Sequence, residues 1–351
     1  MSSVLSRNVA TTAVDDMIIN FDYDNNDRKQ YFLPGELMKG TVVLHLRSGI
    51  RVNRIVMNIK GMANVSWEIP ERKKTYTSNE VYIDISKSLL DGVFKSLNLG
   101  RGTHEFTFNH QLPESLPSSF RGVYGSVTYV MKVELEATNP VHNTVTSQPF
   151  FVFRRPPLSR QSYLPKELKN SKRFLSCCNY GKVKVSSALT RWGGVPGENL
   201  SVNAQVTNWS DRDILRIFAS IVMTSVYHVK DKKITFREII SQREDEYGFN
   251  NRHGRRWRAV KLPIPPYIAD TDLVGCNIMD VTYSFQFMVE LDDYNLDVEG
   301  PVIIGGHPHG YGPASDAISL ARPASEIRDF PNYGRMGRSI DDFSEDIFFD
   351  R

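Results

Sequence analysis

One short stretch occurs twice in this chain and constrains its fold more than any other feature. The first copy reads Leu33-Pro34-Gly35-Glu36, and the second reads Val195-Pro196-Gly197-Glu198, 162 positions later (196 minus 34). Proline fixes its own φ angle and glycine readily takes the left-handed conformation, so each Pro-Gly pair predicts a tight turn. A repeat at this distance is one domain length, so it indicates a duplicated domain rather than a solenoid.

The residues after each turn alternate between apolar and polar, which is typical of a strand with one buried face. A second echo supports the duplication, because Val127-Thr128-Tyr129 recurs as Val281-Thr282-Tyr283, 154 positions later (281 minus 127). The apolar positions of the two turn-following strands are Val42, Leu44 and Leu46 in the first copy and Val202, Ala204 and Val206 in the second.

The spacing of apolar residues predicts strands along most of the chain and no helical stripe of twelve residues or more. This pattern favours an all-β protein with two tandem immunoglobulin-like antiparallel β-sandwich domains and a flexible tail. The expected divisions are a flexible arm at 1–16, a first sandwich at 17–155, a linker at 156–175, a second sandwich at 176–306 and a flexible tail at 307–351.

One segment departs from the two-residue rhythm. Leu90, Val93, Phe94 and Leu97 follow the spacing of an apolar stripe on a short helix. Gly92 lies inside the stripe and weakens a helix by about 1 kcal/mol relative to alanine. A short helix and a loop that packs its apolar residues both remain open for this segment.

Composition bounds the class of protein. The 351 residues carry a formal net charge of +3, too small to indicate nucleic-acid binding by itself. No apolar run approaches the roughly 20 residues that cross a bilayer, and the first residues lack a signal-peptide pattern, so a cytoplasmic protein is expected. Three cysteines without a Cys-x-x-Cys spacing argue against a disulfide framework or a zinc site.

No catalytic or cofactor-binding motif occurs in the sequence, so neither enzymatic activity nor a bound cofactor or metal is expected. His307 and His309 form a His-x-His pair without further ligands nearby, and a solvated tail is the preferred interpretation. Cys276 lies in an apolar context that favours a small core residue. A redox role for Cys276, Cys177 or Cys178 is the less favoured alternative.

The densest cationic run is Arg252 to Arg258, expected as part of a hairpin loop over 244–258. Arg255, Arg256 and Arg258 are the candidates for binding phosphoinositide headgroups or phosphorylated peptides, because guanidinium groups pair well with phosphate. A solvated hairpin with charges on both faces is the competing interpretation. Nucleic acid is not an expected ligand, because no aromatic platform accompanies the cations.

Taken together, these motifs resemble the arrestin fold family, and most closely the alpha-arrestins, also called arrestin domain-containing proteins. Both Pro-Gly-Glu turns, their order and their spacing carry the resemblance over roughly 17–306. The other matching features are Gly61, Ala63, Trp67, Gly102 to Phe106, Phe108, Leu112-Pro113, Leu116 to Phe120, Tyr124-Gly125, Asn208, Ser210, Ile264-Pro265-Pro266, Cys276, Tyr283 and Ile303-Ile304-Gly305.

The resemblance implies a non-catalytic cytosolic adaptor that links membrane cargo to endocytic, ubiquitination or sorting machinery, peripherally at the plasma membrane or endosomes. Its expected partners are cargo tails, with clathrin adaptors and ubiquitin ligases as further candidates. The Pro-Pro-x-Tyr motif by which alpha-arrestins recruit ligases is absent, and only Phe330-Pro331-Asn332-Tyr333 comes near it. A retromer-type sorting subunit and a cysteine-dependent thioredoxin-binding regulator are the alternatives.

The tail contains two candidate adaptor-binding motifs. Tyr333 and Met336 match the Tyr-x-x-Φ pattern that clathrin adaptors read as an added strand. Phe348 and Phe349 lie in an acidic segment that partly resembles the adaptor motif of beta-arrestin tails. Adaptor binding, docking of the tail onto the sandwiches and a plain solvated tail all remain open.

Overall fold

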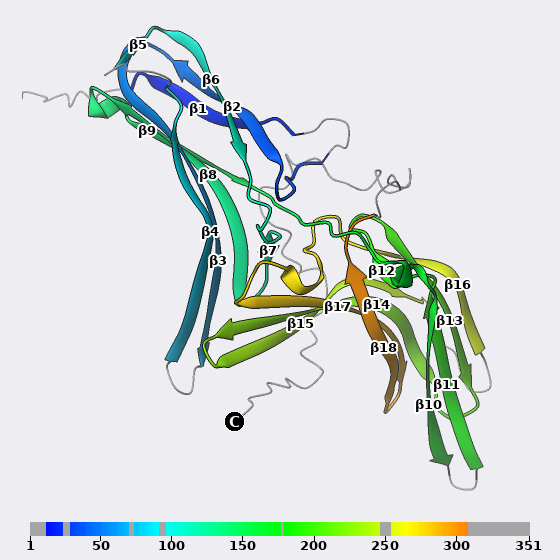
Figure 1. Ribbon diagram of the computed structural model, residues 1–351. Helices are drawn as coiled ribbons and strands as arrows, with labels where there is room; N and C mark the ends of the chain where they lie inside the picture. Colours follow the sequence, from blue (N-terminus) through cyan, green and yellow to red (C-terminus); the bar gives the residue numbers. More distant parts are fainter. Residues whose placement is uncertain are drawn as a thin grey trace, which may run out of the picture. The chain divides into compact units, whose positions relative to one another are not determined.

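The computed structural model describes residues 12–23, 29–69, 74–90, 96–176, 179–245 and 254–307, and these residues are predominantly strands (Figure 1). Three short 3-10 helices accompany them, at Pro140–His142, Arg160–Tyr163 and Thr271–Leu273. The strands are β1 (Val14–Phe21), β2 (Leu37–Leu46), β3 (Ile50–Ile69), β4 (Lys74–Ser88), β5 (Leu97–Leu99), β6 (Gly102–Gln111), β7 (Phe120–Arg121), β8 (Gly125–Ala137), β9 (Thr144–Phe150), β10 (Lys166–Ser176), β11 (Asn179–Leu189), β12 (Gly193–Gly194), β13 (Asn199–Asn208), β14 (Ile214–Val229), β15 (Lys232–Glu244), β16 (Gly254–Pro263), β17 (Met279–Leu291) and β18 (Asn295–Ile304).

The chain divides into two compact units. The first unit contains 1–63, 79–116 and 127–152, and the second contains 64–78, 117–126 and 153–351. The described residues form four sheets, with strand orders β1-β2-β6, β4-β3-β8-β7 with β5 and β9 paired beside it, β10-β11-β13-β16, and β12-β18-β17-β14-β15. The all-β fold with two sandwich domains is therefore confirmed.

Both Pro-Gly-Glu stretches form the predicted turn. Gly35 has a φ angle of 78° and Gly197 has one of 89°, in the region that glycine occupies without a steric penalty. The turns close through hydrogen bonds from Glu36 N to Leu33 O (3.1 Å) and from Glu198 N to Val195 O (3.0 Å). The duplicated turn is thus also a duplicated backbone conformation.

The alternation after each turn also holds. In β2 the side chains of Val42 and Leu44 are fully buried, and in β13 those of Val202 and Val206 are at most 1% exposed. Both members of the Val-Thr-Tyr echo point their valine and tyrosine inward, in β8 and β17. Period-two burial therefore builds the same core in both copies, as the hydrophobic pattern requires.

Two sequence expectations need correction. The second half of the expected linker is strand β10, which pairs along its whole length with β11; its polar composition reflects exposed strand positions rather than a solvated connection. The expected hairpin over 244–258 is also wrong, because β15 pairs with β14 whereas β16 pairs with β13. Residues 245–253 therefore connect two sheets.

The expected helical stripe at Leu90–Leu97 falls mostly outside the described residues, since 91–95 are not described. Leu97 begins the short strand β5 and pairs with Val52 of β3. The second sandwich was expected to end at residue 306. His307 is the last described residue and lies beside Glu198 of the second Pro-Gly-Glu turn, so the described fold extends one residue further.

Candidate functional site: a cationic sheet face

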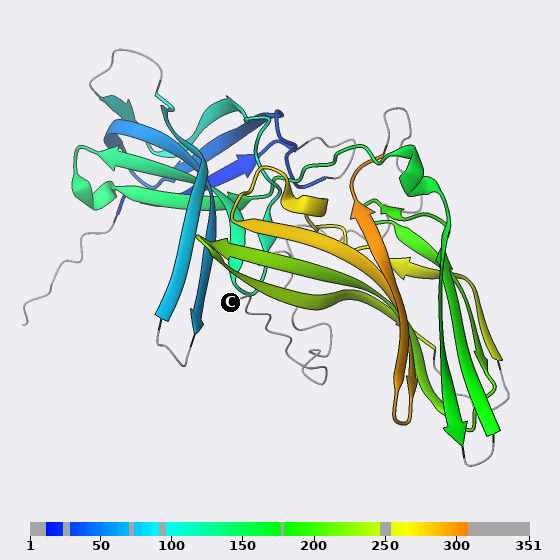
Figure 2. The ribbon, with the colours of Figure 1, turned by 60° about the horizontal axis from the view of Figure 1, so that its bottom comes forward.

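The outward face of the sheet β10-β11-β13-β16 collects basic side chains from several strands. Alternation sends Val183, Val185 and Val206 into the core, so their neighbours in sequence point outward. Figures 1 and 2 show β10 and β11 running side by side, as their antiparallel pairing requires. We define the cationic face as the following outward residues: Lys169, Arg173, Lys182, Lys184 and Arg256.

Strand register places these cations in successive rows. Lys169 lies opposite Ser186, which lies opposite Gln205, which in turn lies opposite Arg256. In the next row Lys184 lies between Ser171 and Thr207. In the last row Arg173 lies opposite Lys182, whose backbone is hydrogen-bonded to that of Trp209 in both directions. Hydroxyl and amide side chains therefore alternate with ammonium and guanidinium groups across the face.

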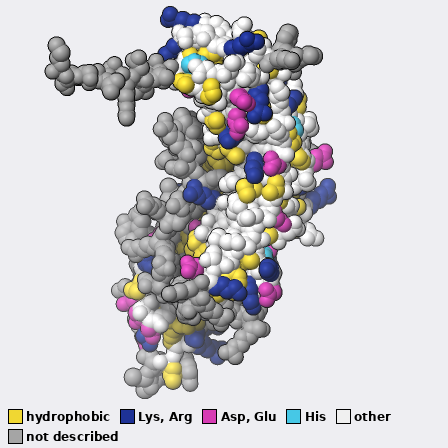
Figure 3. All heavy atoms as spheres, turned by 90° about the vertical axis from the view of Figure 1, so that its left-hand side faces the viewer, with side chains coloured by type: hydrophobic (Ala, Val, Ile, Leu, Met, Phe, Trp, Pro, Cys, Tyr) yellow, Lys and Arg dark blue, Asp and Glu magenta, His cyan; other side chains and the backbone are white. Residues whose placement is uncertain are grey.

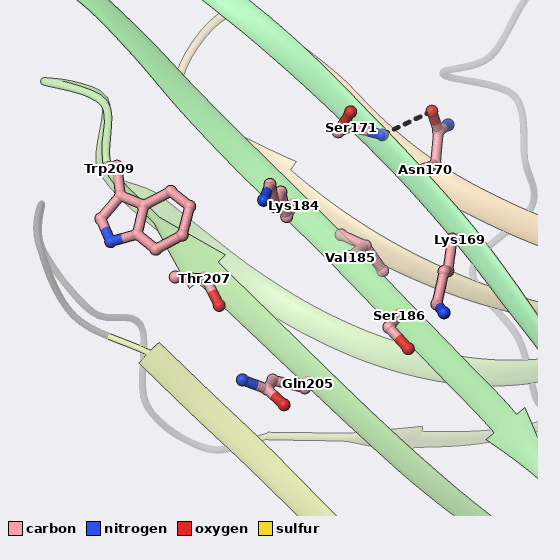
Figure 4. A pocket seen from close by; sticks show the side chains of 9 residues that line it. All are labelled: Lys169, Asn170, Ser171, Lys184, Val185, Ser186, Gln205, Thr207 and Trp209. Atoms are coloured by element: carbon pink, nitrogen blue, oxygen red, sulfur yellow. Dashed lines mark hydrogen bonds between the residues drawn. The ribbon is translucent and has the colours of Figure 1, made fainter.

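A shallow hollow of about 660 Å³ opens on this face, and Figure 4 shows the side chains around it. Trp209 forms one side of the hollow and is 56% exposed, which is unusual for a side chain of its size. The ammonium of Lys184 lies 5.0 Å from the centroid of the Trp209 ring, a cation–π contact. The lining residues are Lys169, Asn170, Ser171, Lys184, Val185, Ser186, Gln205, Thr207 and Trp209.

Acidic side chains neutralise little of this charge. Lys169 pairs with Glu167 at 2.7 Å, and the hydroxyl of Ser186 donates to the same carboxylate. These two donors hold the pKa of Glu167 below its ordinary value. Arg256 donates to the amide oxygen of Gln205 at 3.1 Å. Within the described part of the chain, Arg173 and Lys182 form no ion pair.

The three arginines predicted as one binding run lie in different environments. Arg255 points away from the cationic face, with its Nε 2.7 Å from Asp245 Oδ2, and the indole of Trp257 donates to the same oxygen at 2.9 Å. Arg256 joins the cationic face. Arg258 is exposed beside a β-bulge, at which Ala259 has a φ angle of 49°. Strand alternation separates these neighbours, and their binding role stays a prediction.

Of the cysteine and tail candidates, Cys276 lies in the described part of the chain, away from the residues of the cationic face. Cys276 is 9% exposed and its amide donates to Leu273 O, so its thiol is mostly shielded from solvent. Cys177 and Cys178 lie outside the described residues, as do all four tail candidates: Tyr333, Met336, Phe348 and Phe349.

A buried carboxylate in the second unit was missed by sequence reasoning. Asp270 is fully buried, and Ser118 donates its hydroxyl to Asp270 Oδ1 at 2.5 Å while accepting the amide of Arg154 at 2.8 Å. Burial raises the pKa of Asp270, against the opposing effect of the Ser118 hydroxyl. The only signal in the sequence was one acid at the end of the apolar run Ile268-Ala269-Asp270.

The second Pro-Gly-Glu turn holds a further charged cluster. Glu198, which is 8% exposed, pairs with the guanidinium of Arg191 through one oxygen, and its other oxygen lies 2.8 Å from His307 Nε2. His307 was expected in a solvated tail, and the structure corrects this. Its partner in the His-x-His pair, His309, lies outside the described residues.

Among the described residues, no group of three or more His, Cys, Asp or Glu side chains is placed to hold a metal ion. No helix in the described ranges is long and apolar enough to cross a membrane.

Comparison with known proteins accounts for this architecture. The model of the arrestin (or S-antigen) N-terminal domain matches residues 19–156, and that of the C-terminal domain matches residues 179–309. Similar relatives include human arrestin domain-containing protein 4, which is 26% identical over 312 residues, or 84% of this chain and 73% of the relative. Arrestin domain-containing protein 17 of Caenorhabditis elegans is 25% identical over 340 residues, covering 88% and 76%, and human arrestin domain-containing protein 1 is 24% identical over 308 residues, covering 86% and 68%. With both family domains present in order over most of its length, the chain belongs to the arrestin family.

Proposed function

We propose that this chain is a non-catalytic adaptor that binds acidic segments in the cytoplasmic tails of membrane-protein cargo and brings that cargo to sorting or ubiquitination machinery. Family membership supports an adaptor or scaffold role in general. The observation that carries the finer proposal is the cationic face, where five basic side chains accompany an exposed tryptophan.

The chemistry of this face suits a peptide rather than a small substrate. The hollow is shallow and open, so it provides no enclosed, water-excluded volume for a reaction. Ammonium and guanidinium groups attract carboxylate or phosphate, and the hydroxyls of Ser171, Ser186 and Thr207 supply hydrogen bonds between them. Trp209 offers apolar contact to a neighbouring side chain of the bound peptide.

The identity of the sorting or ubiquitination partners is proposed from the family resemblance alone. Clathrin adaptors remain proposed partners through Tyr333, Met336, Phe348 and Phe349, and phosphoinositides through Arg256 and Arg258. Direct recruitment of ubiquitin ligases through their WW domains is not proposed, because the sequence lacks a Pro-Pro-x-Tyr motif. The shielded position of Cys276 gives the thioredoxin-binding alternative no support.

Affinity purification of the tagged full chain from detergent-solubilised membranes tests the proposal. The wild type is expected to recover membrane proteins with acidic cytoplasmic segments, and Lys184→Glu is expected to lose them. Lys39→Glu, the same charge reversal on an exposed strand position of the first unit, serves as the matched control and is expected to retain them. Equal recovery by all three proteins, or recovery of soluble proteins alone, would contradict the proposal.

A further inference from the structure

One hydroxyl of the cationic face differs from the others in its surroundings. The Ser186 hydroxyl donates to Glu167, and Thr207 lies on β13, between β11 and β16. Ser171 is exposed on β10, which ends the strand order of its sheet. Within the described ranges, the Ser171 hydroxyl makes no hydrogen bond to another residue, since only its backbone amide is bonded to a side chain. Ser171 therefore presents a free hydroxyl oxygen at the hollow (Figure 4).

Positive charge surrounds this hydroxyl. Lys184 lies directly opposite Ser171 on β11, where paired side chains are about 5 Å apart. Lys169 and Arg173 lie two residues to either side on the same face of β10, about 6.6 Å along the strand. Arg173 in turn lies opposite Lys182, and like charges in that position destabilise a sheet. A dianionic group on the Ser171 oxygen would therefore lie among three cations and offset part of this repulsion.

The sequence around Ser171 also suits the enzymes that attach such a group. A basic residue stands two positions before it, at Lys169, and two more follow directly after it, at Lys172 and Arg173. Protein kinases select their substrates partly by the charges of the residues that flank the acceptor. A kinase with an acidic substrate groove is complementary to this pattern.

Strand β10 is accessible to such a kinase at low cost. None of the residues 166–175 of β10 is buried, and Leu175 near its end is 71% exposed. A strand that buries so little apolar surface separates locally from its partner for a small part of the global free energy of unfolding. Within its sheet β10 is paired with β11 alone among the described strands, so this separation breaks one ladder. Ser171 and its neighbours are thus available as an extended segment.

We propose that Ser171 is phosphorylated by a serine kinase that selects basic flanking residues, and that the phosphate closes the cationic face to acidic segments. In the transfer, the Ser171 oxygen attacks the γ-phosphorus of ATP bound to the kinase. A bond forms between that oxygen and phosphorus, and the bond from phosphorus to the β,γ-bridging oxygen breaks. ADP leaves, and the hydroxyl proton passes to the catalytic base of the kinase.

The phosphate acts on the face through its charge. It carries about two negative charges at neutral pH, and pairing with Lys184 and Arg173 removes two of the cations that an acidic segment would use. The same group occupies part of the hollow that Trp209 borders. Closure of the face rests on the proposed function, whereas phosphorylation of Ser171 rests only on the residues around it.

Phosphate transfer to the purified full chain tests the site. The chain is incubated with magnesium, ATP and a purified kinase that selects serine between basic residues, and phosphopeptides are mapped by mass spectrometry. Ser171 is expected to be occupied at least tenfold more than Ser147, which is exposed on β9 opposite Lys132 but has no lysine or arginine within two positions. Lys169→Gln/Arg173→Gln is expected to lower the occupancy of Ser171 at least fivefold. Equal occupancy of the two serines, or phosphate on other hydroxyls only, would overturn the site.

Phosphoserine introduced during translation tests the effect of the phosphate directly. The second pKa of the phosphate in Ser171→phosphoserine, followed by phosphorus NMR, is expected to lie below that in Ser147→phosphoserine, because neighbouring cations favour the dianion. The affinity of the full chain for a polyglutamate probe is expected to fall at least tenfold in Ser171→phosphoserine. In Ser147→phosphoserine it is expected to fall less than twofold.

These measurements separate two kinds of failure. If the wild type does not bind polyglutamate, the proposed function fails, while the transfer reaction and the phosphate pKa still decide whether Ser171 is the site. If the wild type binds and Ser171→phosphoserine binds equally well, or if both phosphates share one pKa, the phosphate does not engage the cations and closure of the face is wrong.

Discussion

The outward faces of two corresponding sheets differ in charge although their buried faces follow the same pattern. In the sheet β1-β2-β6 of the first unit, the outward positions include one lysine, Lys39, against two acids, Asp16 and Glu105. The corresponding sheet of the second unit carries the five cations of the cationic face. In the view of Figure 3, from the side on which β3, β4 and β9 lie, basic and acidic side chains are interspersed instead.

This difference shows that the inward and outward residues of a duplicated strand are under different physical constraints. Inward positions must fill a core at close packing, so both copies retain apolar side chains there. Outward positions meet water, where most substitutions change stability by less than about 0.5 kcal/mol. Charge on the outward face is therefore free to diverge, and the concentration of one sign on one copy is the observation on which the proposed binding function rests.

The two turn glutamates provide a second contrast. Glu36 accepts the amide of Leu33 at 2.7 Å and pairs with Lys29 at 3.1 Å. Glu198 instead holds two cationic or titratable side chains, Arg191 and His307, and is more deeply buried. The same residue closes the turn in the first copy and also anchors the last described residue in the second.

The largest expected effect tests this contrast between the turns. Glu198→Ala leaves Arg191, which is mostly buried, without its carboxylate and is expected to destabilise the fold by about 3 kcal/mol. Glu36→Ala is expected to cost about 1 kcal/mol, because the Glu36 side chain is 27% exposed against 9% for Glu198, so water more readily replaces the lost carboxylate. Chemical denaturation of each variant measures the difference. Equal losses would show that the second glutamate has no additional structural role.

The next prediction compares corresponding inward positions, Gly40 and Val202, again 162 positions apart (202 minus 40). A Cβ atom at Gly40 would collide with Asn20 O and with the Phe108 ring, so Gly40→Ala is expected to cost about 2 kcal/mol by overpacking. Val202→Ala is expected to cost about 2 kcal/mol by the opposite cause, a cavity.

Adding Phe108→Leu distinguishes the two causes. It gives the Cβ introduced by Gly40→Ala room and is expected to recover part of that loss, while it leaves the loss from Val202→Ala unchanged. Calorimetric unfolding of the single and double variants provides the measurement. If Phe108→Leu does not recover any of the stability lost in Gly40→Ala, the Phe108 ring is not what limits the side chain at position 40.

A smaller effect is expected for charge reversal on the outward faces. Lys184→Glu is expected to weaken binding of a polyglutamate probe about tenfold, or about 1.4 kcal/mol, since it replaces an attraction by a repulsion. Lys39→Glu is expected to change binding less than twofold. The affinity of the wild type should also fall as salt increases. Isothermal titration at two salt concentrations checks both points, and similar losses for the two variants would remove the distinction between the faces.

The smallest effect concerns pH. Ser118 and Asp270 occupy corresponding places in the two copies. Ser118 follows Leu112-Pro113, Asp270 follows Ile264-Pro265, and the two residues are 152 positions apart (270 minus 118). Burial raises the pKa of Asp270 in the folded chain, so the unfolded chain releases this proton at lower pH. The free energy of unfolding therefore falls as pH rises from the ordinary aspartate range through the raised pKa of Asp270.

Asp270→Asn removes that charge but keeps an oxygen that accepts the hydrogen bond from Ser118. It is expected to unfold at a higher temperature than the wild type at neutral pH, and the advantage should shrink as pH falls toward the ordinary aspartate range. Ser118→Ala is the control, because it removes a donor without removing the titrating group. A difference between Asp270→Asn and wild type that does not vary with pH would contradict the assignment.

Local sequence patterns were sufficient where burial or backbone conformation repeats along the chain. The turns at Gly35 and Gly197 and the inward residues of β2 and β13 followed from Pro-Gly chemistry and period-two alternation alone. The same reasoning misread Lys166–Ser176 as a linker, because an exposed strand and a solvated connection have the same polar composition. Pairing with β11, a contact with another segment, distinguishes the two.

By itself, the sequence determined the family, the fold class and the duplication, because each depends on patterns repeated within short segments. Only the tertiary structure decided which charges act together. Arg255 and Arg256 are neighbours in the chain, yet strand alternation gives Arg255 to Asp245 and Arg256 to the cationic face. Lys169, Lys184 and Arg256 are far apart in sequence and share that face through strand register. Register arises from long-range hydrogen bonding and core packing, which no local pattern encodes.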